Sequence, residues 1–161
     1  MIPDHIAALR AKVGSEVVLQ IPGINAVVVG PEGVLLQRSA ETLEWSLLSG
    51  ILDPGEEPAA GVVREVYEET GVWVVPERLA AVTVSGVVTH KNGDQAQYLE
   101  LVFRCRPVSG EARVNDDESL EVAWFPVDAL PAMAARMRER IDLALKNEPE
   151  AWFRAVEVPA V

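Results

Sequence analysis

The sequence predicts an α/β fold in which a mixed β-sheet lies between helices. Short runs rich in Val, Ile and Leu recur between turns that contain Gly or Pro, which is typical of strands. Two longer segments, one in the middle of the chain and one near its end, have the pattern of helices. The 161 residues are enough to bury one core, so we expect residues 1–161 to form a single domain.

The first part of the chain is predicted to contain one short helix and several strands. Apolar residues at helical spacing over residues 3–13 indicate a helix that stops at Gly14. A loop region is expected over residues 39–57. Strands are expected at residues 17–21, closed by Pro22-Gly23, and at residues 24–29, 34–38 and 45–48.

The clearest helix spans residues 58–70, because Pro58 suits its first turn and Gly71 its C-terminal cap. Strands joined by a hairpin turn at Asn92-Gly93 are expected at residues 79–89 and 95–106. A further strand at residues 122–125 precedes a helical stretch over residues 129–145, whose start we expect at Pro131. Trp152 and Phe153 are predicted to pack the tail against the body.

Residues 98–106 alternate between two faces of a strand. The face expected to meet the core carries Leu99, Leu101, Phe103 and Cys105, and the other carries Tyr98, Glu100, Val102, Arg104 and Arg106. The second face borders either a pocket or solvent. Cys105 is therefore expected to be a buried small residue. As the only cysteine it forms no internal disulfide, which fits a reducing cytoplasm.

The composition restricts the partners that we expect. The net charge is -11 and the pI about 4.6, so an acidic surface disfavours duplex nucleic acid. No apolar stretch approaches the ~20 residues that span a membrane, and no targeting segment is visible. We expect a cytoplasmic protein. A small phosphorylated partner would need a cation to screen its charge, and a divalent metal ion is the obvious candidate.

Three glutamates on the central helix point to such an ion. Glu65, Glu68 and Glu69 stand at positions i, i+3 and i+4, so they share one face although like charges at this spacing destabilise a helix. Gly61 within the helix costs up to about 1 kcal/mol more. Such local inconsistency is expected at functional sites. Three carboxylates suit Mg²⁺, whereas the plain alternative is a solvated acidic face.

The surrounding motif decides between these alternatives. Residues 50–72 resemble the Nudix box at nine specified positions of fixed spacing: Gly50, Glu56, Arg64, Glu65, Val66, Glu68, Glu69, Gly71 and Val72. The strands before the box and the strands and helix after it are also similar to that family. One departure is Ser49, which stands where many members have a turn glycine, and which brings a hydroxyl close to the expected site.

The resemblance implies a Nudix-type α/β/α sandwich with a mixed β-sheet, which holds Mg²⁺ or Mn²⁺ against a diphosphate. It implies that Glu68 and Glu69 are metal ligands, that Glu65 is a ligand or the general base, and that the Gly50 carbonyl completes the shell. Glu68 is also a candidate catalytic group. Arg64 and Glu56 are expected to support the site.

Residues outside the box are weaker candidates. Glu118, in the acidic run before Trp124, is our choice for an additional metal ligand, with a polar loop as the alternative. Candidate substrate-binding residues are Arg38, Trp45 and Tyr98. Arg38 is otherwise an ordinary surface arginine, and Trp45 otherwise packs in the core. His90 beside the hairpin turn is expected to be a solvated loop residue, with selection of the substrate at a pocket as the alternative.

The function implied is hydrolysis of a phosphoanhydride (pyrophosphate) bond in a nucleoside diphosphate derivative or a nucleoside triphosphate. The alternatives are a non-catalytic Nudix-like module that binds a nucleotide and regulates a partner, an isopentenyl diphosphate isomerase-like enzyme, and a plain acidic metal-binding protein. The isomerase would need a reactive cysteine, which Cys105 is not expected to be. Since dimers are frequent in the family, a homodimer is a candidate assembly.

Overall fold

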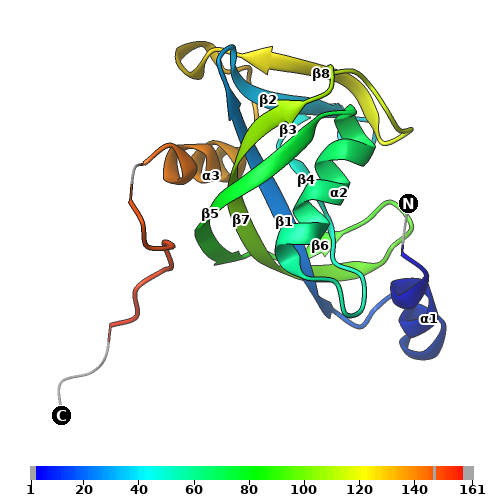
Figure 1. The fold of residues 1–161 in the computed structure, drawn as a ribbon. Coiled ribbons are helices and arrows are strands. Elements are labelled where there is room, and N and C mark those ends of the chain that lie inside the picture. Colours follow the sequence, from blue (N-terminus) through cyan, green and yellow to red (C-terminus); the bar gives the residue numbers. More distant parts are fainter. Residues whose placement is uncertain (1–2, 147, 158–161) are drawn as a thin grey trace.

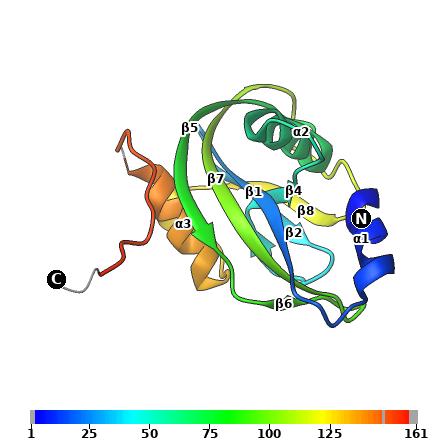
Figure 2. The ribbon, with the colours of Figure 1, turned by 90° about the horizontal axis from the view of Figure 1, so that it is seen from below.

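The computed structural model describes residues 3–146 and 148–157, and it has a mixed β-sheet with helices on both sides (Figures 1 and 2). The predicted α/β fold is therefore confirmed. The helical elements are α1 (Asp4–Val13), α2 (Pro58–Thr70), the short 3₁₀ turn η1 (Val127–Ala129) and α3 (Ala135–Leu145). The strands are β1 (Leu19–Gly30), β2 (Gly33–Ser39), β3 (Trp45–Ser46), β4 (Leu48–Ile51), β5 (Trp73–Val84), β6 (Val88–Thr89), β7 (Gln95–Ser109) and β8 (Ser119–Phe125).

The sheet is organised around the parallel pair β1 and β7, in register from Leu19 opposite Ala96 to Val28 opposite Cys105. β5 runs antiparallel along the other edge of β7. The remaining edge of β1 is shared, because β4 pairs with residues 23–26 in its middle and β2 pairs with its end. β8 pairs with β2 from Val34 to Ser39, and beyond Leu35 the edge of β2 that faced β1 pairs with β3. The sheet therefore forks beside β4.

Each face of the sheet has its own core. On one face Ile24, Ala26 and Val28 pack with Val62 and Val66 of α2. On the other face a second cluster includes Val27, Val102 and Ile141 of α3. Figure 2 shows α2 and α3 on opposite sides of the strands. A strand covered on both faces needs apolar residues at most positions, which explains the nearly continuous apolar run of β1.

Two segments match their predictions closely. Helix α2 has the predicted bounds, with Pro58 in its first turn and Gly71 in the left-handed conformation that glycine favours (φ 72°). The Asn92-Gly93 turn joins β6 to β7, and Gly93 has φ 88°. The signals for the two ends of the helix and for the hairpin turn were therefore reliable.

The prediction of two strands separated at Pro22-Gly23 was wrong, because β1 runs through both residues. The Pro22 carbonyl accepts from the Leu52 N–H at 3.3 Å, so this residue turns its main-chain groups away from β7. The missing proline N–H therefore removes no bond from the parallel ladder. The expected loop over residues 39–57 was also partly wrong, since Ser49 and its neighbours form β4.

The bounds near the C-terminal end also differed. β5 begins at Trp73, six residues before the predicted start, and β6 is separate from it. α3 begins at Ala135 and not at Pro131, because residues 127–129 form the 3₁₀ turn and the chain is extended at Leu130. Trp152 does pair with β5, as predicted, through main-chain bonds of 2.9 Å to Ala80 and Val82. Phe153 does not pack and is 71% exposed.

The alternation along β7 was correct for Cys105, which is fully buried, but wrong for Val102, which is equally buried. Glu100 is also buried, at 8% exposure. Leu99, expected in the core, is exposed. The physical reason is that α3 covers the middle of the second face, which a period of two along one strand cannot reveal.

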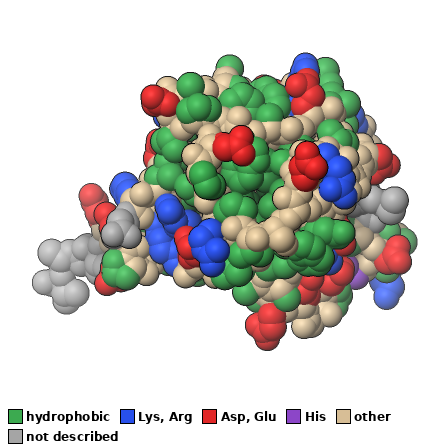
Figure 3. Space-filling model, turned by 45° about the horizontal axis from the view of Figure 1, so that its top comes forward, with side chains coloured by type: hydrophobic (Ala, Val, Ile, Leu, Met, Phe, Trp, Pro, Cys, Tyr) green, Lys and Arg blue, Asp and Glu red, His purple; other side chains and the backbone are tan. Residues whose placement is uncertain are grey.

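The surface and the helices bear on the expected partners. On the face shown in Figure 3, acidic side chains are dispersed among basic and apolar ones. None of the described helices combines the length and apolar character needed to cross a membrane.

Candidate active site

The box glutamates lie where α2 packs over β4. Glu65 rests directly on Gly50, since a Cβ atom built on that glycine would lie 1.9 Å from the Glu65 Oε1. Any other residue at this position would displace the carboxylate. Gly61 is also required for close packing, because a Cβ there would lie 2.6 Å from the Leu52 side chain. The glycine that weakens the helix locally thus lets the box loop pack against it.

Arg64 connects the box carboxylates. Its Nε and Nη2 donate to both oxygens of Glu56, each at 2.8 Å, in a bidentate pair. Its Nη1 donates to Glu65 at 2.8 Å and to Glu68 at 3.1 Å. The bond from Arg64 lowers the pKa of Glu56 despite partial burial. The guanidinium therefore joins the box loop to the helix and restrains the Glu65 carboxylate.

Glu69 is the most buried of the three glutamates, with 3% of its surface exposed. One oxygen accepts from the Gln37 amide at 2.6 Å and the other from the Ser49 main-chain N–H at 3.2 Å. Gln37 is held in turn by the Ser119 hydroxyl, which donates to its carbonyl oxygen at 2.5 Å. Burial raises the pKa of Glu69 well above its usual value, and the charges of Glu65 and Asp116 add to the rise.

The other two glutamates differ in exposure. Burial raises the pKa of Glu65, and the bond from Arg64 opposes part of that rise. The Glu68 side chain is 53% exposed. The site thus runs from a solvated carboxylate at Glu68 to a desolvated one at Glu69, which allows one group to face a substrate while another is held in the interior.

This donor set fits a hard divalent cation. Among the described residues no three acidic, His or Cys side chains already form an ion site, since Glu65 and Glu68 turn toward Arg64 and Glu69 turns toward Gln37. However, none of the described Lys or Arg side chains bonds to Glu69, although two other carboxylates repel it. A cation bound by carboxylate oxygens would relieve this repulsion.

The acidic segment before β8 brings a further carboxylate, that of Asp116, toward Glu69. After burial and the charge of Glu65, the charge of Asp116 adds to the raised pKa of Glu69, and the predicted ligand Glu118 is exposed on the same turn. The Asp116 carboxylate accepts from the N–H groups of Glu118 and Ser119 at 3.2 and 3.1 Å. A turn-forming aspartate after Asn115 was visible in the sequence, but its orientation depends on the fold.

Two predicted substrate residues are engaged elsewhere. Arg38 donates to Glu121 on the neighbouring β8 at 2.6 Å and to the Leu43 carbonyl at 3.1 Å. Trp45 packs edge-on against Phe125, with centroids 4.7 Å apart, in the cluster on the α3 face. Of the two alternatives for Trp45, this packing favours the core on the α3 face over a contact with substrate.

Tyr98 does lie close to the box. A Cβ on Gly23 would be 3.5 Å from the Tyr98 ring and 3.6 Å from the Gly50 carbonyl oxygen, so Gly23 lies between the two, and the ring is on the face of β7 that carries Glu100. The Tyr98 hydroxyl is 2.8 Å from His90 Nε2, and His90 Nδ1 is 3.4 Å from Glu41. His90 is thus a partner of Tyr98, which the prediction of a solvated loop histidine missed. Burial raises the Tyr98 pKa.

Cys105 lies in the α2-side core. Burial raises the pKa of its thiol to about 12, so it is held as the neutral thiol at neutral pH. This agrees with the prediction that it is no nucleophile and removes support from the isomerase alternative.

Comparison with known proteins decides the family. The family model described as the NUDIX domain matches residues 19–144. The chain belongs to the Nudix family. It is 36% identical over 118 residues to a MutT-like protein of Streptomyces ambofaciens, covering 71% of this chain and 69% of that protein. The predicted resemblance is confirmed, and with it the expectation of an enzyme that acts on phosphoanhydride bonds.

Two other similar proteins extend the comparison. The NAD-capped RNA hydrolase NudC of Pseudomonas aeruginosa is 34% identical over 135 residues, covering 81% of this chain but 46% of that protein. A crystal structure of an ADP-ribose pyrophosphatase from Streptococcus suis superposes with a TM-score of 0.64 at 25% identity, covering 81% of this chain and 96% of the other. The Nudix fold accounts for nearly all of the second and under half of the first. Helix α1 lies outside the matched residues.

Proposed function

We propose that this Nudix protein hydrolyses the phosphoanhydride bond of a nucleoside diphosphate derivative, with Mg²⁺ or Mn²⁺ as its cofactor. The observation that carries the proposal is that the buried Glu69 and the partly buried Glu65 repel one another beside the exposed Glu68. Carboxylates that lack sufficient cationic partners within the protein are suited to an external divalent ion.

In this proposal Glu68 and Glu69 would hold the ion with the Gly50 carbonyl, Glu65 would be a further ligand or the general base, and the segment before β8 would add a carboxylate from the predicted Glu118 or from Asp116. A bound divalent ion neutralises phosphate charge and lowers the pKa of a coordinated water. Arg64 keeps the Glu65 carboxylate over Gly50, while Gln37 and the Ser49 N–H orient Glu69. Glu65 accepts the proton of the attacking water, since a carboxyl whose pKa is raised by burial is better matched to that role near neutral pH.

The nucleoside part of the substrate is proposed to contact Tyr98, which lies beside the Gly50 carbonyl. Glu41 lies next to His90 in this region, so its local charge disfavours phosphate and favours an uncharged group. The names of two relatives, a NAD-capped RNA hydrolase and an ADP-ribose pyrophosphatase, support a diphosphate bridging two groups. A nucleoside triphosphate is the second candidate substrate.

The test is hydrolysis of a panel of such compounds by wild type, Glu68→Gln and Glu57→Gln, with and without Mg²⁺ or Mn²⁺. Glu57 is an exposed box residue that makes no side-chain cap bond to α2, so its variant is a matched control. We expect metal-dependent turnover of one compound class that Glu68→Gln abolishes and Glu57→Gln retains. Binding of metal and nucleotide without turnover of any compound would favour the regulatory module instead.

Several expectations remain predictions. They are the single domain over residues 1–161, the cytoplasmic location, the exclusion of duplex nucleic acid and the homodimer. A sedimentation measurement on the purified protein tests the last of these directly.

A further inference from the structure

The C-terminal end of α2 is completed by a distant segment of the chain. The last four carbonyls of a helix lack partners within it and need donors from elsewhere. In α2 these belong to Tyr67, whose carbonyl already accepts from the Gly71 N–H at 2.8 Å, and to Glu68, Glu69 and Thr70. The helix carries no basic residue in its last turn, so it provides no charged donor of its own there.

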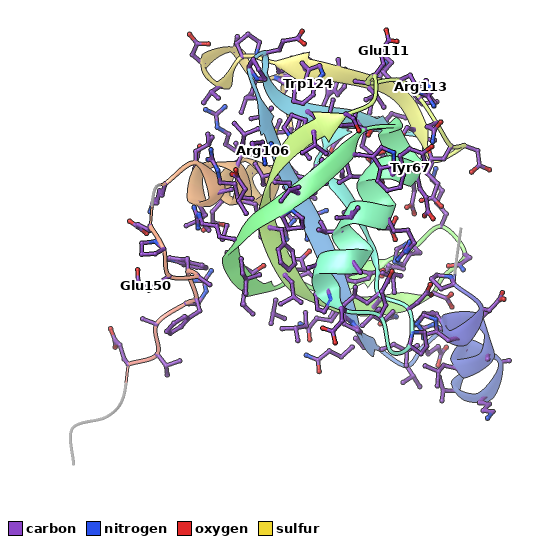
Figure 4. The ribbon with its side chains drawn as sticks, viewed as in Figure 1. Tyr67, Arg106, Glu111, Arg113, Trp124 and Glu150 are labelled. Carbon is purple, nitrogen blue, oxygen red and sulfur yellow. The ribbon has the colours of Figure 1, made fainter. Side chains whose placement is uncertain are left out.

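The loop between β7 and β8 supplies these donors. The Asn115 side-chain amide donates to the Tyr67 and Glu68 carbonyls at 3.0 and 3.2 Å. Its main-chain N–H donates to the Glu69 carbonyl at 3.3 Å, and the Arg113 N–H donates to Thr70 at 3.1 Å. Figure 4 shows Arg113 and Tyr67 at the same end of α2. Every one of the four carbonyls thus has a donor from residues 113–115.

Arg113 also orients the asparagine. Its Nη2 donates to the Asn115 Oδ1 at 3.1 Å, which leaves the amide nitrogen directed at the helix. The guanidinium lies over Gly71, where a Cβ would be 2.7 Å from Nη1. A cation at this position is also favoured by the helix dipole. The helix end is therefore held by an ordered pair of side chains.

Two of the four carbonyls belong to residues whose side chains are the proposed metal ligands. The next residue after Asn115 is Asp116, whose charge acts on Glu69. Asn115 therefore holds the main chain of Glu68 and Glu69 and sets the position of Asp116 relative to them. We propose that Asn115 is a positioning residue that fixes the carboxylates of α2 for the divalent ion. This rests on the proposed function, because it assigns a use to the same site.

The test compares Asn115→Asp, which keeps the side-chain shape but loses the amide donor, with Glu111→Ala in the same loop. Glu111 contributes only its main-chain carbonyl to this network, so its variant is the control. Mn²⁺ alone is titrated against each protein by water proton relaxation, and amide hydrogen exchange is followed in α2. We expect Asn115→Asp to weaken Mn²⁺ binding about tenfold, the loss typical of residues that orient metal ligands. Exchange should accelerate in the last turn of α2, and Glu111→Ala should match wild type.

Unchanged Mn²⁺ affinity in Asn115→Asp, with or without a lower melting temperature, would show that Asn115 only caps the helix, and it would overturn the inference. If that variant does not fold, Arg113→Gln replaces it, since it removes the bond that orients Asn115, and a weakening of at least about threefold is then expected. Equal affinity in Arg113→Gln would overturn the inference equally. Failure of the proposed hydrolysis is distinguishable, because it appears as absent turnover in wild type while Mn²⁺ binding and its dependence on Asn115 persist.

Discussion

Two buried glutamates on opposite sides of the sheet show that one residue type can have two kinds of surroundings. Glu100 on β7 faces α3 and forms an ion pair with the buried Arg140, while the Thr83 hydroxyl donates to it at 3.1 Å. Glu69 on α2 is at least as buried, but its partners are the neutral Gln37 amide and a main-chain N–H.

The difference lies in where the compensating charge comes from. Burial lowers the pKa of Arg140 and the Glu100 charge opposes this, so the pair is balanced within the chain. Around Glu69 the neighbouring charges are Glu65 and Asp116, which both raise its pKa. A buried charge without an internal partner is costly and is retained where it has a function. We therefore expect the Glu100–Arg140 pair on the α3 face to contribute to stability and Glu69 on the α2 face to serve the proposed ion.

The largest expected effects come from removing the charge of each carboxylate in turn. Glu100→Gln leaves the Arg140 charge buried and unpaired, so we expect a loss of about 3–5 kcal/mol in the free energy of unfolding. Glu69→Gln should leave the fold intact but reduce turnover by about 100-fold or more, as expected for a group that acts in the transition state. Urea denaturation and steady-state kinetics measure the two effects.

Thr83→Val is the control for Glu100→Gln, because it removes one bond to Glu100 but no charge. It should cost about 1 kcal/mol. If Glu69→Gln destabilised the protein as much as Glu100→Gln and retained activity, the division between the two faces would be wrong.

Added metal should sharpen the comparison with a smaller effect. A ligand that binds only the folded state at 100 times its Kd stabilises that state by about 2.7 kcal/mol. We expect Mg²⁺ or Mn²⁺ to raise the melting temperature of wild type and of Glu100→Gln, whose α2 face is unchanged. Glu69→Gln should gain little. Thermal melts with and without EDTA measure this. An equal rise in melting temperature in Glu100→Gln and Glu69→Gln would show that Glu69 does not contribute to binding the ion.

The metal-free protein should also show a pH dependence that originates at Glu69. A carboxyl whose pKa is raised in the folded state holds its proton there after the unfolded chain has released it. Its contribution to stability is therefore greatest at low pH and declines as the pH rises from about 4.5, the unfolded value, through the folded pKa. Glu69→Gln cannot ionise, so its stability relative to wild type should increase over this window and then level off.

Denaturation of wild type and Glu69→Gln in EDTA, at pH values from about 4 to about 8, tests the direction of this change in stability. If the difference in the free energy of unfolding between wild type and Glu69→Gln stayed constant over this pH range, Glu69 would ionise in the folded protein as it does in the unfolded chain.

The sequence predicted those parts of the molecule that depend on local chemistry. The bounds of α2 followed from Pro58 and Gly71, and the box residues were found by their spacing alone. What remained hidden depends on which chain segments meet. Gln37 is 32 positions from Glu69, and Asn115 is 47 from the Glu68 carbonyl that it caps. No periodicity relates such residues, so an inward-facing glutamine and a capping asparagine look like ordinary polar positions.

The same limit explains the errors. Trp45 and Glu100 were assigned by residue type and by alternation, but their surroundings are set by the packing of β8 and α3 on the far face. Pro22 was taken as a strand end because its partner strands were unknown. Local signals identify an element, whereas the burial of each of its faces is decided by the elements that cover it.

Ser49 carries the smallest expected effect. Its main-chain N–H holds Glu69, and it is opposite Asn25 on β1, one residue from Ile24 and Ala26, which both face α2. Side chains alternate along paired strands, so the Ser49 hydroxyl points to the face opposite α2.

Ser49→Gly keeps the N–H, so turnover should stay within about threefold of wild type and stability should fall by about 0.5–1 kcal/mol from the added backbone entropy. Ser49→Ala, which retains that restriction on the backbone, should match wild type in both. A large loss of turnover in both variants, measured by the same kinetic assay, would show that the hydroxyl itself acts on Glu69 or the substrate and that the main chain alone does not hold this carboxylate.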